Sequence, residues 1–431
     1  MNFPRIFLIC LLITSFASIP AEARITGAFF QLNEARINQT RLHWQEHLDL
    51  MQKAGMDTII IQYSATDSKQ FFGSGTGNTY TYSFFGPFAA GNYEIVIERG
   101  PLVLYEIETS SPFNYEISGS LPSTMFGDDG EKLKDKNRDS LDSAVVWGID
   151  AKDPIIISIE LEEATDSISI IARALSENNP LPDASEFTLN GKTALGTIED
   201  DYFYILDEAE KRDMKVWLGL KLSDMWWSGN LDLKKDLQEN LALAKDLCEK
   251  YGAFQSFYGF YIPHELYPSG MLPQNYLDFF SDLTKGLHKL GKPVSIAPYF
   301  GGNMSPKAHG RYWDRFLSEV PLDVLMLQDG VGCHRLPVEE IPRYYKEVYE
   351  ICQKHDVEFW SDLEVFHQLS GSTFSAEPAS FDRVQKQIVT QRPVVDKIVI
   401  FDWLHYMAPN NGPQAKKLYE DYLNWFFEQQ K

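Results

Sequence analysis

The sequence predicts an α/β fold, a (β/α)8 barrel with an all-β sandwich inserted after the second barrel strand. Two observations lead to this prediction. Apolar runs of strand length alternate with amphipathic helical runs over most of the chain. The alternation stops between residues 66 and 194, where short runs of period two are separated by Gly, Ser, Thr and Pro. An open, doubly wound sheet ranks second, because the glycine-rich turn typical of that fold is missing at Gln31 to Glu34.

The barrel strands are predicted in chain order, each separated from the next by a helix. The first strand precedes a helix from about Arg41 to Ala54, and a second helix opens at Thr197. The helix near Pro273 illustrates the signals, since proline suits a first helical turn and Gly291 ends the apolar periodicity. The predicted strands cover residues 25–32, 58–63, 215–222, 257–262, 293–299, 323–328, 357–363 and 397–403.

The barrel domain is therefore expected at residues 24–65 and 195–431, and the inserted domain at 66–194. Runs of period two within the insert predict a β-sandwich. The stretch Lys132 to Asp135, with Val146-Trp147 and then Ile155 to Leu161, resembles the galactose-binding-like, discoidin-type sandwich. That resemblance implies a jelly-roll-like fold, with carbohydrate binding by the insert as an open expectation.

Residues 1–23 have the pattern of a signal peptide. Arg5 precedes an apolar run from Ile6 to Phe16, and Ala21-Glu22-Ala23 forms a small-x-small cleavage site. We therefore expect cleavage after Ala23 and a secreted or periplasmic protein. No later stretch approaches about 20 apolar residues, so no membrane insertion is expected.

Composition narrows the classes of ligand. The chain has 431 residues with 39 Lys+Arg against 61 Asp+Glu, a formal net charge of -22 that would repel nucleic acid phosphates. Aromatic residues make up 13% of the chain, which suits a neutral carbohydrate with apolar ring faces. Nucleic acid is therefore not expected as a partner, and the oligomeric state is left open. Three cysteines remain after the signal, too few for a disulfide framework, although one bridge is left open: Cys248, Cys333 and Cys352.

Polar and aromatic residues follow the predicted strands, and in a barrel these positions meet at one mouth. Glu265 follows the fourth strand and Glu364 the seventh, and two carboxyl groups across one cleft are what glycoside hydrolysis requires. Asp329, after the sixth strand, is a third candidate catalytic carboxylate. The candidate substrate-binding residues are Gln31, Gln62, Trp226, Trp227, His264, Tyr299, Gln328, Asp362 and Trp403.

Glu265 and Glu364 resemble the catalytic pair of the retaining glycosidases built on TIM barrels. Within that superfamily, residues 27–31 (GAFFQ), 259–265 (GFYIPHE), 328–332 (QDGVG) and 360–364 (WSDLE) are similar to a secreted, cellulase-like domain-of-unknown-function family. The resemblance spans roughly residues 25–64 and 197–428. It implies that Glu265 is the proton donor, that Glu364 is the nucleophile, and that no cofactor or metal takes part. His264 departs from the superfamily pattern, which usually has Asn before the strand-four Glu.

The sequence thus predicts an exported glycoside hydrolase with a retaining mechanism, or an inverting one if the two carboxyl groups lie about 6.5 to 9.5 Å apart. A non-catalytic carbohydrate-binding protein is the alternative. A zinc hydrolase is a weaker rival, because His43 to His47 match the H-x-x-E-H pattern but lie on the first barrel helix with no evident third ligand.

Overall fold

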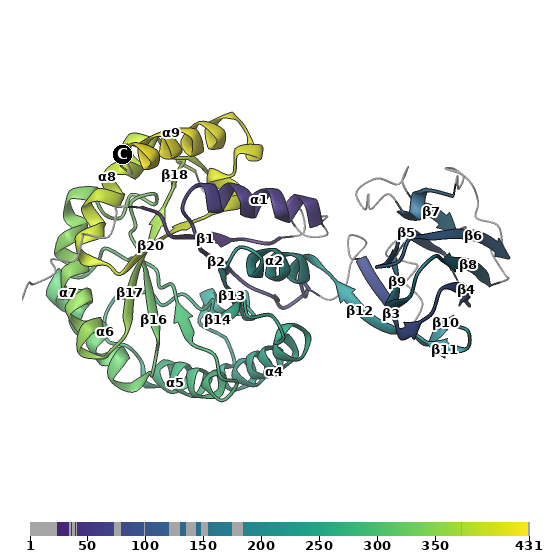
Figure 1. Cartoon of the computed structure of the whole chain (residues 1–431). Helices are drawn as coiled ribbons and strands as arrows, with labels where there is room; N and C mark the ends of the chain where they lie inside the picture. The colour runs from purple at the N-terminus through teal and green to yellow at the C-terminus, as the bar shows by residue number, and fades with distance from the viewer. Residues whose placement is uncertain are drawn as a thin grey trace, which may run out of the picture.

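The structure is a computed structural model. It describes residues 24–33, 36, 39, 41–72, 79–98, 100–119, 130–134, 144–147, 154–174, 184–371 and 373–429. The predicted signal peptide, residues 1–23, lies outside the described residues. Figure 1 shows a barrel ringed by helices and, beside it, a smaller domain of strands.

Eight parallel strands close into a barrel, as the sequence predicts. They follow chain order around the ring, and the last strand pairs with the first. The strands are β1 (Gly27–Phe30), β2 (Thr58–Ile61), β13 (Lys215–Gly219), β14 (Phe257–Ile262), β15 (Val294–Ile296), β16 (Val324–Gln328), β17 (Glu358–Glu364) and β20 (Lys397–Phe401). Each of the eight strands matches a predicted run to within two residues at one or both ends. The runs could be recognised because most of their residues are apolar, as expected for strands buried on both faces.

Helices surround the barrel, and one short helix lies at its mouth beside Glu265. They are α1 (Arg41–Lys53), α2 (Asp201–Glu210), α3 (Met225–Ser228), α4 (Leu233–Tyr251), α5 (Gln274–His288), α6 (Pro306–Glu319), α7 (Ile341–Lys354), α8 (Phe381–Gln391) and α9 (Pro413–Gln429). Local chemistry fixes several of their starts. The Asp200 side chain accepts a hydrogen bond from the Phe203 N–H at α2, and Ser305 accepts one from Ala308 at α6.

The interior of the barrel is packed with side chains below the mouth. A cluster of buried apolar residues draws members from seven strands and from the residue directly after β15: Phe29, Ile60, Trp217, Tyr261, Ala297, Val324, Met326, Trp360 and Val399. Trp217 and Trp360 meet edge to face, with ring centroids 5.9 Å apart. Because this apolar cluster fills the barrel interior, a catalytic site in the barrel is expected at the carboxyl ends of the strands.

The insert is an antiparallel sandwich between β2 and α2. One sheet has the order β11-β10-β4-β8-β6 and the other β12-β3-β9-β5-β7. Its strands are β3 (Thr79–Phe88), β4 (Gly91–Ile97), β5 (Leu102–Thr109), β6 (Phe113–Gly119), β7 (Val145–Trp147), β8 (Ile155–Leu161), β9 (Thr165–Ala174), β10 (Phe187–Leu189), β11 (Lys192–Thr193) and β12 (Leu195–Glu199). The inner faces bury a separate core around Ile95, Ile157 and Ile170.

Both predicted ends of the insert need correction. Thr197 was expected to open a barrel helix, but it lies in β12, which pairs with β3 over five positions. The sandwich therefore reaches Glu199 instead of residue 194, and α2 begins at Asp201. At the other end, Phe71 and Phe72 pack in the barrel core, so the link from β2 stays with the barrel for several residues beyond 65.

Candidate active site

Four carboxyl groups gather at the carboxyl ends of the barrel strands. Glu364 is the last residue of β17 and Asp362 lies two positions before it, so both face the barrel interior. Asp329 directly follows β16, and Glu265 follows β14 by three residues. The buried Asp362 carboxyl is influenced electrostatically by all three of the others. Residues from three strands thus form one acidic site.

Glu265 is the most accessible of the four. It is partly exposed, whereas the other three are buried. Trp226 fixes its backbone by donating its indole N–H to the Glu265 carbonyl at 3.0 Å. Burial raises the pKa of Glu265 to about 7, and a hydrogen bond with the Gln328 side chain opposes the rise. A carboxyl with that pKa keeps a large fraction of its protons near neutral pH, where an ordinary glutamate is ionised, and can protonate a leaving group.

Glu364 is only 2% exposed and is held by the loop after β16. The Cys333 backbone N–H donates to Glu364 Oε2 at 2.8 Å, and the Cys333 thiol also hydrogen-bonds to this carboxyl. A Cβ at Gly332 would lie 2.9 Å from Oε2, so only glycine lets the loop approach this closely. Burial, then the negative Asp329, raises the pKa of Glu364, while the Cys333 hydrogen bonds favour its ionised form.

Asp329 is fully buried, and hydrogen-bond donors occupy both of its oxygens. Gln387 and Gln391 of α8 donate to Oδ2 at 2.6 and 2.7 Å. The Val331 N–H donates to Oδ1 at 3.0 Å, and the Glu364 N–H lies 3.4 Å from the same oxygen. Such a carboxylate is suited to hold the β16 loop and Glu364 in place. Direct attack on a substrate is hard to reconcile with these contacts.

Asp362 lies between the other acids. It is 1% exposed and its Oδ1 has no hydrogen-bond partner among the described residues. Burial, then the charges of Glu364, Asp329, Glu265 and Asp402, raises its pKa well above the ordinary value. Its surroundings therefore favour the protonated form of Asp362. Its place below Glu364 puts it at the bottom of the mouth rather than at an open binding surface.

An aromatic pocket of about 280 Å³ adjoins Glu265. Trp227 is 59% exposed at its rim, while Trp226 is 7% exposed and forms a wall. The pocket is lined by Trp226, Trp227, Gly229, Glu265, Leu266, Tyr267, Leu272, Pro273, Tyr276 and Tyr312. Flat aromatic faces next to a carboxylic acid are suited to hold a sugar ring beside the group that would protonate it.

His264 lies behind this pocket, not in it. The ring is 1% exposed and packs edge to face against Trp226, with centroids 4.8 Å apart. Its Nε2 lies 2.8 Å from the buried Asp236 carboxylate of α4. The structure thus uses His264 to connect the Glu265 segment to α4, and does not place it where a sugar hydroxyl could reach it.

The remaining predicted residues differ in their surroundings. Gln328 hydrogen-bonds to Glu265 and donates to the Ala297 carbonyl at 3.3 Å. Tyr299 lies within electrostatic reach of Glu364 and accepts a hydrogen bond from Arg335. Gln31, directly after β1, hydrogen-bonds to Tyr63. The Oε1 of the buried Gln62, directly after β2, has no hydrogen-bond partner within the described part of the chain.

Trp403 was expected to bind substrate, but it is fully buried outside the barrel ring. Its indole N–H donates to His47 Nδ1 of α1 at 2.9 Å, because the chain turns outward after β20 into a short helical turn, Trp403–Met407. The same contact removes the zinc interpretation. His47 has one ring nitrogen bound to Trp403 and the other 3.2 Å from Asn410.

Three residues of the site went unnoticed in the sequence. Cys333 was considered only for a disulfide, yet it is a free thiol beside Glu364; Cys248 and Cys352 are also free. Arg383 of α8 donates to the Glu364 and Phe366 carbonyls, and Arg335 approaches Tyr299. The Gly-rich segment after β16 was the available signal, because a tight loop at a strand end brings its neighbours into the mouth.

Other kinds of site find little support in the described part of the chain. There, no group of three or more His, Cys, Asp or Glu residues is arranged to hold a metal ion. None of the described helices is long and apolar enough to span a bilayer.

Known structures share this architecture. A candidate alpha-L-fucosidase from Bacteroides thetaiotaomicron superimposes with a TM-score of 0.57 at 17% identity, covering 94% of this chain and 95% of that one. An endo-alpha-mannosidase from the same organism matches with a TM-score of 0.41 at 9% identity, over 94% and 98% of the two chains. The first match shows a common fold, whereas the second superimposes too loosely to show one.

No curated protein matches the sequence. A family model described as a domain of unknown function, DUF4434, matches residues 174–417. That range is more than half of the chain and includes six of the eight barrel strands together with the four clustered carboxyl groups. The chain belongs to the DUF4434 family.

Proposed function

We propose that this protein is a glycoside hydrolase that acts on a poly- or oligosaccharide through Glu265 and Glu364. One observation carries the proposal: the two glutamates, about a hundred residues apart in the sequence, both lie within electrostatic reach of the buried Asp362 at the mouth of one barrel. The aromatic pocket beside Glu265 supports a carbohydrate substrate. The fold shared with the candidate alpha-L-fucosidase agrees with this proposal but is not its basis.

The mechanism we propose is a retaining double displacement. Glu265, the carboxyl beside the aromatic pocket, protonates the departing oxygen. Glu364, whose ionised form the two Cys333 hydrogen bonds favour, attacks the anomeric carbon to form a glycosyl-enzyme intermediate. Glu265 then removes a proton from the water that hydrolyses the intermediate. The pocket at Glu265 would hold the leaving-group sugar. Asp329, with both oxygens occupied, serves as a positioning residue.

Glu364→Ala tests the assignment of the nucleophile. We expect loss of reducing-end release from plant, algal or bacterial glycans by about 10³-fold or more. Sodium azide should restore cleavage of an activated aryl glycoside and yield a glycosyl azide of inverted anomeric configuration. Glu350→Ala, an exposed glutamate on α7, is the matched control and should remain fully active. An active Glu364→Ala protein would refute the assignment.

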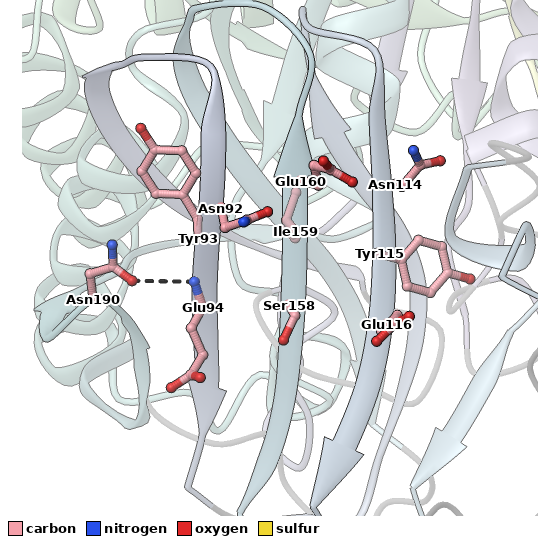
Figure 2. Close-up of a pocket in the computed structure, with 10 residues that line it drawn as sticks. All are labelled: Asn92, Tyr93, Glu94, Asn114, Tyr115, Glu116, Ser158, Ile159, Glu160 and Asn190. Carbon is pink, nitrogen blue, oxygen red and sulfur yellow. Dashed lines mark hydrogen bonds between the residues drawn. The ribbon is translucent and has the colours of Figure 1, made fainter.

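A non-catalytic carbohydrate-binding role is the second candidate, and a hollow on the insert favours it. Asn92 and Glu94 of β4, Ser158 and Glu160 of β8, and Asn114 and Glu116 of β6 line a cavity of about 450 Å³ on the outer face of one sheet. Figure 2 shows these amide, hydroxyl and carboxylate groups side by side on three strands. Such groups can bind sugar hydroxyls independently of any catalytic activity of the barrel.

Two measurements separate the candidates. An enzyme loses turnover in Glu265→Gln and Glu364→Gln but keeps its affinity for glycan. A binding protein has no turnover to lose, and a substitution such as Glu116→Ala would reduce its affinity instead. Export after cleavage at Ala23 stays a prediction, which N-terminal sequencing of the mature protein from its native host would check.

A further inference from the structure

The loop between β16 and α7 brings one exposed arginine to the mouth of the barrel. Hydrogen bonds fix the backbone at Arg335: its N–H donates to the Gly330 carbonyl at 2.7 Å. The same loop is tied to the strand after Glu364, because the Gln368 N–H donates to the Gly332 carbonyl at 3.0 Å. Arg335 therefore starts from a rigid position two residues beyond Cys333, whose N–H binds Glu364.

Aromatic contacts orient the Arg335 side chain. Its Nε donates to the Tyr299 hydroxyl at 3.0 Å, and its guanidinium carbon lies 5.9 Å from the centre of the Tyr299 ring. Tyr299 in turn stacks on Tyr267, a residue that lines the aromatic pocket, with centroids 5.4 Å apart. The guanidinium is thus held at the edge of the same mouth that contains Glu265 and Glu364.

The two terminal nitrogens of Arg335 are free to bind a ligand. Among the described residues, neither Nη atom has a hydrogen-bond partner and no carboxylate forms a salt bridge with Arg335. Arg335 lies two residues beyond Cys333, whose N–H donates to Glu364 Oε2 at 2.8 Å, so an anion bound by Arg335 would lie on the loop that holds the proposed nucleophile.

We propose that Arg335 selects an anionic sugar, one that carries a carboxylate or a sulfate ester, in the subsite next to Glu364. This inference rests on the proposed function. A guanidinium with one edge held by Tyr299 presents its remaining N–H groups as a planar fork, which matches the two oxygens of a carboxylate or sulfate. The fork also explains how a mouth with four carboxyl groups could accept a negatively charged substrate.

Paired ligands that differ only in charge test the proposal. The carboxylate pair is oligogalacturonate and its methyl ester, and the sulfate pair is a sulfated carrageenan oligosaccharide and its desulfated form. Binding is measured by calorimetry with the Glu265→Gln protein, so that no turnover interferes. Arg335→Gln and Arg335→Lys are introduced into that protein, and Arg311→Gln on the exposed face of α6 is the control with the same loss of charge.

We expect the charged member of at least one pair to bind more tightly than its neutral partner. Arg335→Gln should weaken the charged ligand by about 10- to 100-fold and the neutral one by less than about twofold. Arg335→Lys should fall in between, because lysine keeps the charge and loses the fork. Which pair responds distinguishes a carboxylate from a sulfate. Arg311→Gln should bind like the parent protein.

Equal affinity within both pairs, no binding of any charged ligand, or equal losses for charged and neutral ligands in Arg335→Gln would overturn the inference. The last result would mean that Arg335 only holds Tyr299. Turnover of neutral glycans without any preference for charge would leave the proposed function intact. Arg335-dependent binding of an anionic glycan without turnover in the unsubstituted protein would instead refute the proposed function alone.

Discussion

Replacing Glu265 by glutamine should reduce activity and, above neutral pH, stabilise the fold. Burial raises the pKa of Glu265 from 4.5 to about 7. Folding therefore binds the Glu265 proton more tightly, and stability falls as the pH rises from 4.5 through about 7. The full shift corresponds to roughly 3 kcal/mol, and the partial exposure of Glu265 reduces this to roughly 1–2 kcal/mol. Glutamine removes this loss while keeping an oxygen that can accept from Gln328.

Thermal unfolding at two pH values measures the stability effect. At pH 8 the Glu265→Gln protein should melt roughly 2–4 °C above the unsubstituted protein, whereas at pH 4 the two should melt together. Glu249→Gln, an exposed glutamate near the end of α4, makes the same change in charge and should shift neither value. An identical difference at both pH values would show that Glu265 ionises as it does in water.

Kinetics test the role of the same residue in catalysis. Loss of a general acid lowers kcat by about 10²- to 10⁴-fold for a natural sugar leaving group. A dinitrophenolate needs no proton to depart, so hydrolysis of the corresponding aryl glycoside should be far less impaired. The basic limb of the unsubstituted enzyme should fall near pH 7, where Glu265 loses its proton. Equal losses with both leaving groups would contradict the assignment of Glu265 as the acid.

Two further predictions concern the neighbours of the glutamate pair. Asp329→Asn removes a negative charge that raises the pKa of Glu364, so the acid limb of kcat/KM should move to lower pH; an unmoved limb would mean that Asp329 carries no charge in the active enzyme. Trp227→Ala removes an exposed wall of the pocket and should weaken glycan binding by about fivefold to tenfold, corresponding to about 1 kcal/mol of lost stacking. Phe427→Ala, which removes another exposed aromatic side chain, on α9, should leave binding unchanged, and equal effects of the two would place the sugar elsewhere.

The barrel could be predicted because its signals are local. Most barrel strands are short apolar runs buried on both faces, and amphipathic helices alternate with the strands except where the insert follows Thr58–Ile61. The sandwich strands were harder to delimit. β3 contains many polar and aromatic residues, and β12 is defined by its pairing with β3, a contact between positions more than a hundred residues apart.

The site was predictable to the extent that strand ends can be counted. Counting placed Glu265, Asp329 and Glu364 at one mouth, because all strands of a parallel barrel end on the same side. It could not distinguish Trp226, whose indole supports Glu265, from Trp403, whose indole supports α1. Both follow a strand closely, and only the path of the chain after the strand decides which way the ring points.

The sequence by itself determined the alternation of strands and helices, the interruption by an insert and the acidic residues at the strand ends, because these follow from local periodicity and from the common direction of parallel strands. Tertiary structure alone decided what each polar group touches. Asp329 is a positioning residue because Gln387 and Gln391 of α8 donate hydrogen bonds to it. Cys333 belongs to the site because Gly332 permits the loop to approach Glu364 closely. Burial and hydrogen-bond geometry depend on residues distant in the chain, and these two quantities set the charge and the chemical role of each carboxyl group.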